Sequence, residues 1–335
     1  MGRKSAARRQ LALRADVNWR RRPAGRNGGL AANWHCVRMS IGGGGGAPDP
    51  EASFSGPSQV RDHAFPQHPP GFATLDLEVR TKVRPLLCEL HAHTTWSDGE
   101  LALHELVDLY RRSGFDVLTV TDHVLRTDAA AGGGAPPAGV HEANHAAYLA
   151  AVRSEAARAR RSYDMVVIPG VELTYDDPEP ARAAHALAIG CPEFVALDRG
   201  LETALARASD LGAAIVAAHL EAPDDRPRRV RRTQRFWREW NLLGGLVDRY
   251  ELYNGRDLFG WVADAGPPAV AGGDFHRPQH IGGWKTLIPC EKREDDLVAY
   301  LRSTRPVYFA LVEPGLTPPL RRRRDRPEKV TAAAS

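Results

Sequence analysis

Imidazole and carboxylate side chains follow short apolar runs at many places in this sequence. The first example is Leu86–Leu90, which leads directly into His91 and His93. The residues that repeat this pattern, at the end of or within later apolar runs, are Asp122, His123, Glu172, His185, His219, Asn254, Asp274 and His276. Imidazole and carboxylate ligands together suit Zn, Mn or Fe, and the sequence has no cluster of thiols for a structural zinc site. The residue types therefore predict a divalent-metal centre.

The spacing of these residues supports the same prediction. His91 and His93 are two residues apart, and so are Asp274 and His276. Residues two apart on an extended strand point to the same side, so each pair can face one ion. Taken singly, Asp122 and Asp274 would serve equally well as helix caps. Because ligand-capable residues recur at matching positions of several runs, the joint pattern favours a metal centre.

Short apolar runs that alternate with longer helical stretches must position these residues. The predicted strands are Leu86–Leu90, Val117–Val120, Met165–Ile168, Ala184–Ile189, Ala214–Ala218, Tyr250–Tyr253, Ala269–Ala271 and Val307–Leu311. The predicted helices are Leu101–Ser113 and segments at about 141–162, 199–211, 230–243, 256–264 and 293–303. This alternation indicates a parallel sheet and predicts an α/β fold of the barrel type. The C-terminal ends of the strands in such a barrel share one rim, so we expect the polar residues to meet there.

Composition divides the chain into a globular body and two basic ends. Hydrophobic residues make up 43% and charged residues 26%, which is typical of a folded protein. We expect residues 1–72, with five consecutive glycines and several prolines, to be a disordered extension. We expect residues 73–315 to form the metal-binding domain and residues 316–335 to be a basic, disordered tail. Residues 41–320 contain 29 basic and 38 acidic residues, a balance of about −9, so the body is acidic.

Cysteine content and hydropathy bear on the location of the protein. The four cysteines, Cys36, Cys88, Cys191 and Cys290, are too few and too far apart for a disulfide framework, which fits a reducing compartment. No stretch approaches the ~20 apolar residues of a transmembrane helix, and the start of the chain lacks the apolar run of a secretory signal. We therefore expect a cytoplasmic protein with no membrane partner, and we expect translation to begin at Met39.

Four ordered motifs resemble those of the polymerase-and-histidinol-phosphatase (PHP) family of metal-dependent phosphoesterases. They are HAHTTWSDG at His91–Gly99, TDH at Thr121–His123, GVE at Gly170–Glu172 and GDFH at Gly273–His276. The resemblance covers about residues 86–312, and His185 and His219 fill the remaining ligand positions. It implies a distorted (β/α)7 TIM-like barrel with phosphoesterase activity, which we expect to act without an attached polymerase.

The resemblance also implies two to three divalent ions, Zn, Mn or Fe, held by nine side chains. The first ion is expected to bind His91, His93, Glu172 and Asp274. The second is expected to share Glu172 and to add His185 and His219. The third is expected to bind Asp98, His123 and His276.

Further roles follow from the motifs and from neighbouring positions. Glu172 and Asp274 are predicted to act in catalysis as ligands, and Asp122 is predicted to orient a ligand or to pass a proton to the leaving group. The candidates for contacting substrate, or for standing behind the ligands, are Arg126, Glu251, Asn254, Arg256, Arg277 and Lys285. Each of the four cations among them has a plain alternative as a solvated surface charge.

Several functions are compatible with the sequence. The first is hydrolysis of a small phosphomonoester or a nucleotide-type phosphoester, with a histidinol-phosphate-type phosphatase as one form of it. The same ions would also serve the hydrolysis of a carboxylic ester or lactone. A different class is a nucleic-acid-binding module that uses its basic ends, to which Arg228, Arg229, Arg231 and Arg232 could add a local basic rim. The acidic body favours a small phosphorylated substrate, because a groove for extended nucleic acid must neutralise many phosphates.

Overall fold

The computed structural model describes residues 15–18, 36–40, 84–126, 138–223 and 233–313. Most of the predicted extension, residues 1–72, lies outside these ranges. So do the predicted tail, residues 316–335, and the arginine cluster at Arg228, Arg229, Arg231 and Arg232. Two short strands of the extension are described, and the second pairs in parallel with a strand near the end of the domain.

The described strands are β1 (Ala15–Asn18), β2 (Cys36–Ser40), β3 (Leu86–Glu89), β4 (Val117–Val120), β5 (His123–Leu125), β6 (Val166–Tyr175), β7 (Ala184–Ile189), β8 (Ala214–Ala218), β9 (Arg249–Asn254), β10 (Asp257–Leu258), β11 (Ala269–Gly272), β12 (Gly283–Ile288) and β13 (Tyr308–Glu313). The described α-helices are α2 (Leu103–Arg112), α3 (Glu142–Tyr163), α4 (Leu201–Asp210), α5 (Arg235–Arg238), α6 (Trp240–Leu243), α7 (Gly260–Ala265) and α8 (Glu294–Leu301). Two 3₁₀ turns are η2 (Gly244–Leu246) and η3 (Pro278–Ile281).

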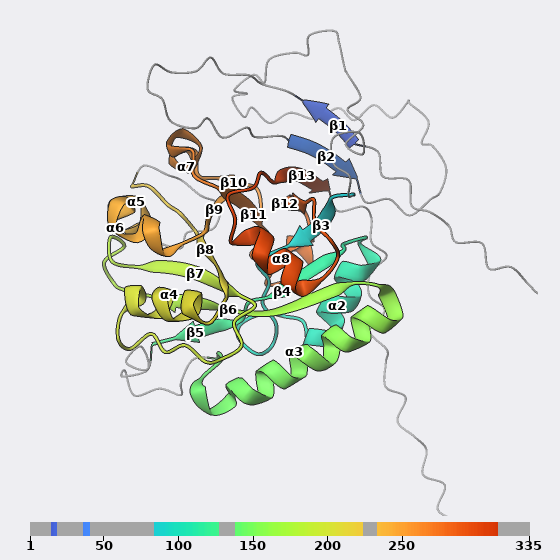
Figure 1. The fold of residues 1–335 in the computed structure, drawn as a ribbon, viewed down its shortest axis with the longest axis horizontal. Helices are drawn as coiled ribbons and strands as arrows, with labels where there is room; N and C mark the ends of the chain where they lie inside the picture. Colours follow the sequence, from blue (N-terminus) through green and yellow to red (C-terminus); the bar gives the residue numbers. More distant parts are fainter. Residues whose placement is uncertain (1–14, 19–35, 41–83, 127–137, 224–232, 314–335) are drawn as a thin grey trace, which may run out of the picture.

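One curved sheet contains these strands. Neighbouring strands follow the order β1-β2-β13-β12-β3-β4-β6-β7-β8-β9-β10, while β5 pairs with β6 and β11 pairs with β9 beside this path. Figure 1 shows the strands from β3 to β9 curling around a common interior, with α3 and α4 on the outside. The predicted α/β class with a distorted, barrel-like sheet is confirmed.

The sheet is less regular than the parallel barrel that the alternation of elements predicts. β7 runs antiparallel to both β6 and β8, and β12 runs antiparallel to both β3 and β13. The link from β6 to β7 spans only residues 176–183, which is too short for the crossover that parallel pairing requires. The sequence pattern does not predict β12, because Lys285 and Thr286 interrupt its apolar run.

Two consecutive short strands lie along the long strand β6. β4 pairs in parallel with Val166–Pro169, and β5 pairs in parallel with Glu172–Thr174. The register places His123 opposite Glu172, so two of the predicted ligands are neighbours across one strand pair.

The longer helices bury one face each in the core of the domain. α2 buries Leu106, Val107 and Tyr110, and it ends before Gly114, which turns the chain with φ of 83°. α3 packs along β6, and α4 packs on β7 and β8. Every residue of β3, β4, β8 and β11 is buried, which explains why these strands are such continuous apolar runs.

Within the described residues, no helix has both the length and the apolar character needed to cross a membrane.

Candidate metal centre

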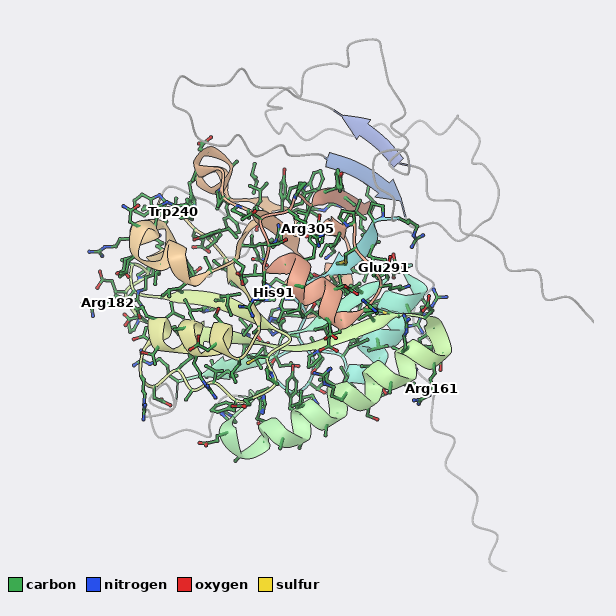
Figure 2. All side chains as sticks on the ribbon, viewed as in Figure 1. His91, Arg161, Arg182, Trp240, Glu291 and Arg305 are labelled. Atoms are coloured by element: carbon green, nitrogen blue, oxygen red, sulfur yellow. The ribbon has the colours of Figure 1, made fainter. Side chains whose placement is uncertain are left out.

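The strand ends bring the predicted ligands to one rim of the sheet. His91 and His93 follow β3, His219 follows β8, and Asp274 and His276 follow β11. These strands run in the same direction, so their C-terminal ends share that rim. Figure 2 labels His91 in the interior, far from the exposed side chains of Arg161, Arg182 and Glu291 at the periphery.

His185 reaches the same rim from the opposite direction. It lies at the second residue of β7, and the antiparallel register pairs it with Thr174 on β6 and with Ala218 on β8. Because β7 is antiparallel, its beginning stands where β6 and β8 end. The side chain therefore joins the other ligands although it does not follow a strand.

The carboxylate of Glu172 lies at the middle of the histidines. Its Oε2 atom is 3.4 Å from Nε2 of His91, 3.3 Å from Nε2 of His93 and 3.0 Å from Nδ1 of His123. Its Oε1 atom is 2.9 Å from Nδ1 of His185 and 3.1 Å from Nε2 of His219. The two oxygens thus face two different sets of imidazoles.

The nine predicted ligands form four overlapping groups whose ligand atoms lie within 4.8 Å of one another. The groups are His91, His93 and Glu172; His91, His219 and Asp274; Glu172, His185 and His219; and His93, Asp98, His123 and His276. The Oδ1 atom of Asp274 lies 3.6 Å from Nε2 of His91 and 3.6 Å from Nε2 of His93. The three sets of ligands that the motifs imply are therefore each brought together.

Several buried ligand atoms in this cluster have no hydrogen-bond partner among the described residues. They are Nε2 of His91, Nε2 of His93, Nδ1 of His185, Nε2 of His276 and Oε2 of Glu172. A buried polar atom without a partner costs ~1–3 kcal/mol, and native structures contain few of them. Five such atoms in one cluster fit cation ligands, so the donor set suits the divalent ions that the motifs imply.

Backbone strain coincides with two of the ligands. His219 has φ of 53° and Asp274 has φ of 48°, in the left-handed region that non-glycine residues rarely adopt. At His219 the backbone N–H donates to Oε2 of Glu251 at 3.1 Å, and the hydroxyl of Thr233 donates to the carbonyl. Strain of this kind persists where surrounding contacts fix it, and such residues cluster at functional sites.

Glu251 and Asn254 stand behind the ligands. Glu251 accepts a hydrogen bond from Nδ1 of His91 at 2.9 Å, which leaves Nε2 of that imidazole for the centre. Asn254 donates to Glu251 at 3.0 Å and lies 3.4 Å from Nδ1 of His219. Both side chains are buried, so the structure gives them the role of orienting histidines, one of the two roles that the sequence left open for them.

Asp122 occupies an equivalent position behind His93. Its carboxylate accepts hydrogen bonds from the backbone and hydroxyl of Thr94, at 2.8 and 2.9 Å, and from the hydroxyl of Ser97 at 2.6 Å. The same Ser97 hydroxyl lies 3.5 Å from Nδ1 of His93. Burial raises the pKa of Asp122, although these hydrogen bonds oppose the shift.

Two residues of the centre escape the sequence motifs. Asp176 contacts Nε2 of His185 at 2.9 Å, and the hydroxyl of Thr174 lies 2.7 Å from Nδ1 of His123. Glu172, Thr174 and Asp176 are spaced by two along β6 and its continuation, so they share one face. This two-residue spacing could have identified Thr174 and Asp176 from the sequence, once Glu172 is assigned as a ligand.

Charges within the centre shift the pKa values in opposite directions. Burial opposes ionisation of Glu172, but His123 and His91 outweigh it and hold the pKa of Glu172 well below its ordinary value. Burial also opposes the charge on His123, yet Glu172 and Asp98 raise the pKa of His123 to about 10. For His93, burial and the neighbouring His123 lower the pKa well below its ordinary value. Without a cation, His123 is therefore positively charged near neutral pH, whereas His93 is neutral.

The four cationic residues that the sequence proposes for contacting substrate differ from one another in exposure and contacts. Arg256, two residues after Asn254, and Arg277, directly after His276, are both exposed. The guanidinium of Arg126 lies 4.6 Å from the ring centre of Tyr175. Successive side chains of β6 point to opposite faces of the sheet, so Tyr175 points away from the face that carries Glu172 and Thr174. Arg126, which contacts the Tyr175 ring, is therefore on the face opposite the centre.

Lys285 lies inside the domain and not at its surface. Its side chain is completely buried, and its ammonium group donates to the carboxylate of Glu89 at 2.5 Å. Its strand, β12, pairs with both β3 and β13, so the residue predicted from the sequence to contact substrate has a partner within the sheet.

No protein-family model matches the sequence, and no curated protein matches it either. Solved structures do match. One is a two-domain protein from Bacteroides vulgatus that contains a predicted PHP-like metal-dependent phosphoesterase, with 19% identity and a TM-score of 0.46 over 67% of this chain and 64% of that one. This chain thus spans a little under two thirds of that protein.

Two further structures have similar levels of likeness. A protein from Bifidobacterium adolescentis, described as a metal-dependent phosphoesterase, has 16% identity and a TM-score of 0.36 over 56% of this chain and 87% of that one. An amidohydrolase from Chromobacterium violaceum, with bound sulfate and no metal, has 17% identity and a TM-score of 0.38 over 57% of this chain and 88% of that one. At these identities the likeness does not extend to activity or substrate.

Proposed function

We propose that this protein is a divalent-metal-dependent hydrolase of small phosphate esters, as the sequence motifs suggest. The observation that carries the proposal is the position of Glu172, whose two carboxylate oxygens face separate sets of histidines. A carboxylate in this position can bridge two cations. Phosphatases and nucleases use cation pairs ~3.5–4 Å apart for in-line displacement at phosphorus.

The motifs suggest which residues would hold each ion, and the distances among the side chains support that division. His91, His93, Glu172 and Asp274 would hold the first, and Glu172, His185 and His219 the second, while Asp98, His123 and His276 would hold a third. Bound ions would supply an activated water nucleophile and would neutralise phosphate oxygens as charge develops on them.

The exposure of the ligands indicates where a substrate would approach. Glu172, His91 and His93 are completely buried, whereas His123 and His276 are 16% and 13% exposed and Asp98 is 53% exposed. A phosphate ester would therefore reach the centre over the group that contains Asp98. Arg277 follows His276 directly and is exposed, so it would be available to bind a phosphate oxygen or the leaving group from that side.

The buried residues behind the ligands would keep the centre preorganised. Glu251 holds Nδ1 of His91, and Asp122 holds Ser97 against His93. Because each imidazole then presents a fixed nitrogen to the centre, little reorganisation is needed when cations and substrate bind.

The proposal is tested by elemental analysis and by a substrate screen. Protein reconstituted with Mn²⁺ should retain two to three equivalents of metal per chain, and it should hydrolyse at least one member of a panel of phosphorylated metabolites, nucleotides and short oligonucleotides. Retention of less than half an equivalent after reconstitution would rule out a metal-dependent hydrolase.

A further inference from the structure

The barrel-like sheet has a seam between β11 and β12. In the described part of the chain, β11 forms its backbone ladder with β9, whereas β12 forms ladders with β3 and β13. The seam is closed by side chains: the hydroxyl of Thr286 on β12 accepts from the backbone N–H of Ala271 at 2.8 Å and donates to its carbonyl at 2.9 Å. The strand that leads to Asp274 is thus fixed to its neighbour by side-chain hydrogen bonds.

A buried ion pair lies along the same seam, next to the metal centre. Glu89 is the last residue of β3, and Lys285 precedes Thr286 on β12. Both side chains are completely buried, and the lysine ammonium donates to Oε2 of Glu89 at 2.5 Å. The hydroxyl of Tyr110, on α2, donates to the same oxygen at 2.8 Å.

The other oxygen of Glu89 joins the two strand ends that carry ligands. Oε1 accepts the backbone N–H of Gly273 at 2.7 Å, just before Asp274. It also accepts the backbone N–H groups of Leu90 and His91, at 3.1 and 3.2 Å. One carboxylate therefore connects the backbone of His91 with the residue that precedes Asp274.

The glycine at position 273 is what lets the ion pair approach so closely. A Cβ atom there would lie 2.1 Å from Nζ of Lys285 and 2.2 Å from Oε2 of Glu89. Real Cβ atoms do not make such contacts, so any side chain at this position would displace the pair or the backbone. This packing explains why position 273 is a glycine.

A buried ion pair is weak as a source of stability, because taking two charges out of water costs about as much as their attraction returns. Its better attested use is to fix one arrangement of the surrounding chain. Here the arrangement that it fixes is the separation of His91 from Asp274, whose Nε2 and Oδ1 atoms are 3.6 Å apart.

We propose that Glu89 and Lys285 are positioning residues, which set the relative position of His91 and Asp274 across the seam so that both can bind the same cation. This inference rests on the proposed metal site. It replaces the sequence-based prediction that Lys285 binds substrate with a role in assembling the ligands.

Three explanations of Lys285 predict different results for the variant Lys285→Met. If only its charge mattered, removing a positive charge beside the centre would strengthen the binding of Mn²⁺. If Lys285 positions the ligands, its removal leaves Glu89 buried without its cation and disturbs the seam, so Mn²⁺ binding should weaken by ~10–100-fold, as for other outer partners of metal ligands. If it binds substrate, Mn²⁺ binding should be unchanged and only KM should rise.

The experiment measures Mn²⁺ affinity by equilibrium dialysis and the visible absorption of the Co²⁺-loaded protein, for the wild type and four variants. Lys285→Met and Gly273→Ala should both weaken binding and alter the Co²⁺ spectrum. Glu89→Gln/Lys285→Met keeps an acceptor for the N–H of Gly273 without an unpaired charge, so it should recover most of the affinity that Lys285→Met loses. Gly245→Ala is the matched control, because a Cβ atom at Gly245 meets nothing within 4 Å.

The outcomes separate the two proposals. A wild type that binds no Mn²⁺ refutes the proposed function. A wild type that binds Mn²⁺, with Lys285→Met or Gly273→Ala binding it equally tightly and with the same Co²⁺ spectrum, refutes the positioning role. If near-UV circular dichroism shows that Lys285→Met does not fold, Gly273→Ala and the double variant decide the question. Gly273→Ala keeps both Glu89 and Lys285, and the double variant removes both charges, so neither contains a buried carboxylate whose cation has been deleted.

Discussion

Asp176 lies 2.9 Å from Nε2 of His185 and thereby directs Nδ1 of that imidazole at the centre. Nδ1 is 2.9 Å from Oε1 of Glu172 and has no hydrogen-bond partner in the described structure. A carboxylate behind a histidine ligand fixes its tautomer and orientation. Although Asp176 is 61% exposed and lies outside the family-like motifs, it acts on the centre through His185.

Asp176→Ala should therefore weaken Mn²⁺ binding and lower turnover by ~10–100-fold. Asp176→Asn, which keeps an oxygen as acceptor, should have the smaller effect. Asp210→Asn, at the exposed end of α4, is the control for loss of one surface carboxylate. Equal Mn²⁺ affinity of Asp176→Ala and the control would show that His185 does not depend on Asp176.

Glu172→Gln should cause the largest loss of any single substitution in the centre. The change keeps the shape of the side chain but removes the charge that five imidazoles face, so the ions would lose their shared ligand. Activity should fall by more than the ~10–100-fold typical of an outer partner such as Glu251. Steady-state turnover and metal content of the purified variant test this, and near-normal turnover would disprove the bridging role.

Binding of Mn²⁺ should release protons near neutral pH. Burial lowers the pKa of His91, but Glu251 and Glu172 outweigh it and raise that pKa well above its ordinary value. Glu172 and Asp98 likewise raise the pKa of His123 to about 10 despite burial. Without a bound cation both imidazoles are then in the positively charged form at pH 7, whereas a histidine must be neutral to coordinate a metal ion.

The apparent affinity for Mn²⁺ should accordingly rise between pH 6 and pH 9. Titration calorimetry in two buffers of different ionisation enthalpy measures the protons released per ion. An affinity that is independent of pH, with no proton release, would contradict the protonation of these histidines.

The preferred substrate should be a small phosphomonoester or short nucleotide-type ester, and its hydrolysis should depend weakly on salt. Residues 41–320 carry 29 basic and 38 acidic residues, and the exposed cations that follow Asn254 and His276 in the sequence are the single arginines Arg256 and Arg277. A protein that makes many phosphate contacts loses ~10³-fold or more in affinity between 50 and 200 mM salt. We expect kcat/KM to change far less over that range.

Hydrolysis of a small phosphomonoester beside a 20-nucleotide single strand, across the same salt range, tests this prediction. A preference for the polymer with a steep salt dependence would contradict it. Arg228, Arg229, Arg231 and Arg232, which lie outside the described residues, would then be the first positions to substitute.

The sequence by itself identified nine side chains that the structure brings together in the centre, although it did not identify Thr174 or Asp176. The predicted strands are local runs rich in apolar residues, and His91, Asp122 and Asp274 each come within three residues of the end of such a run. Strands of one direction must end at one rim, so the position of a residue after a run is enough to bring it there. For the same reason the α/β class and the barrel-like sheet follow from the order of the elements.

The tertiary structure decided what local patterns do not encode. The direction of β7, which brings His185 to the rim, depends on pairing with β6 and β8. The burial of Lys285 depends on Glu89, a partner 196 residues away in the sequence. From the sequence alone, a lysine in a short run that polar residues interrupt is expected at the surface, because an unpaired charge cannot remain buried. The fold changes this expectation because it places a carboxylate beside the lysine. Pairing between distant strands and distant charges thus decides which residues support the centre, and the local sequence around the ligands does not show it.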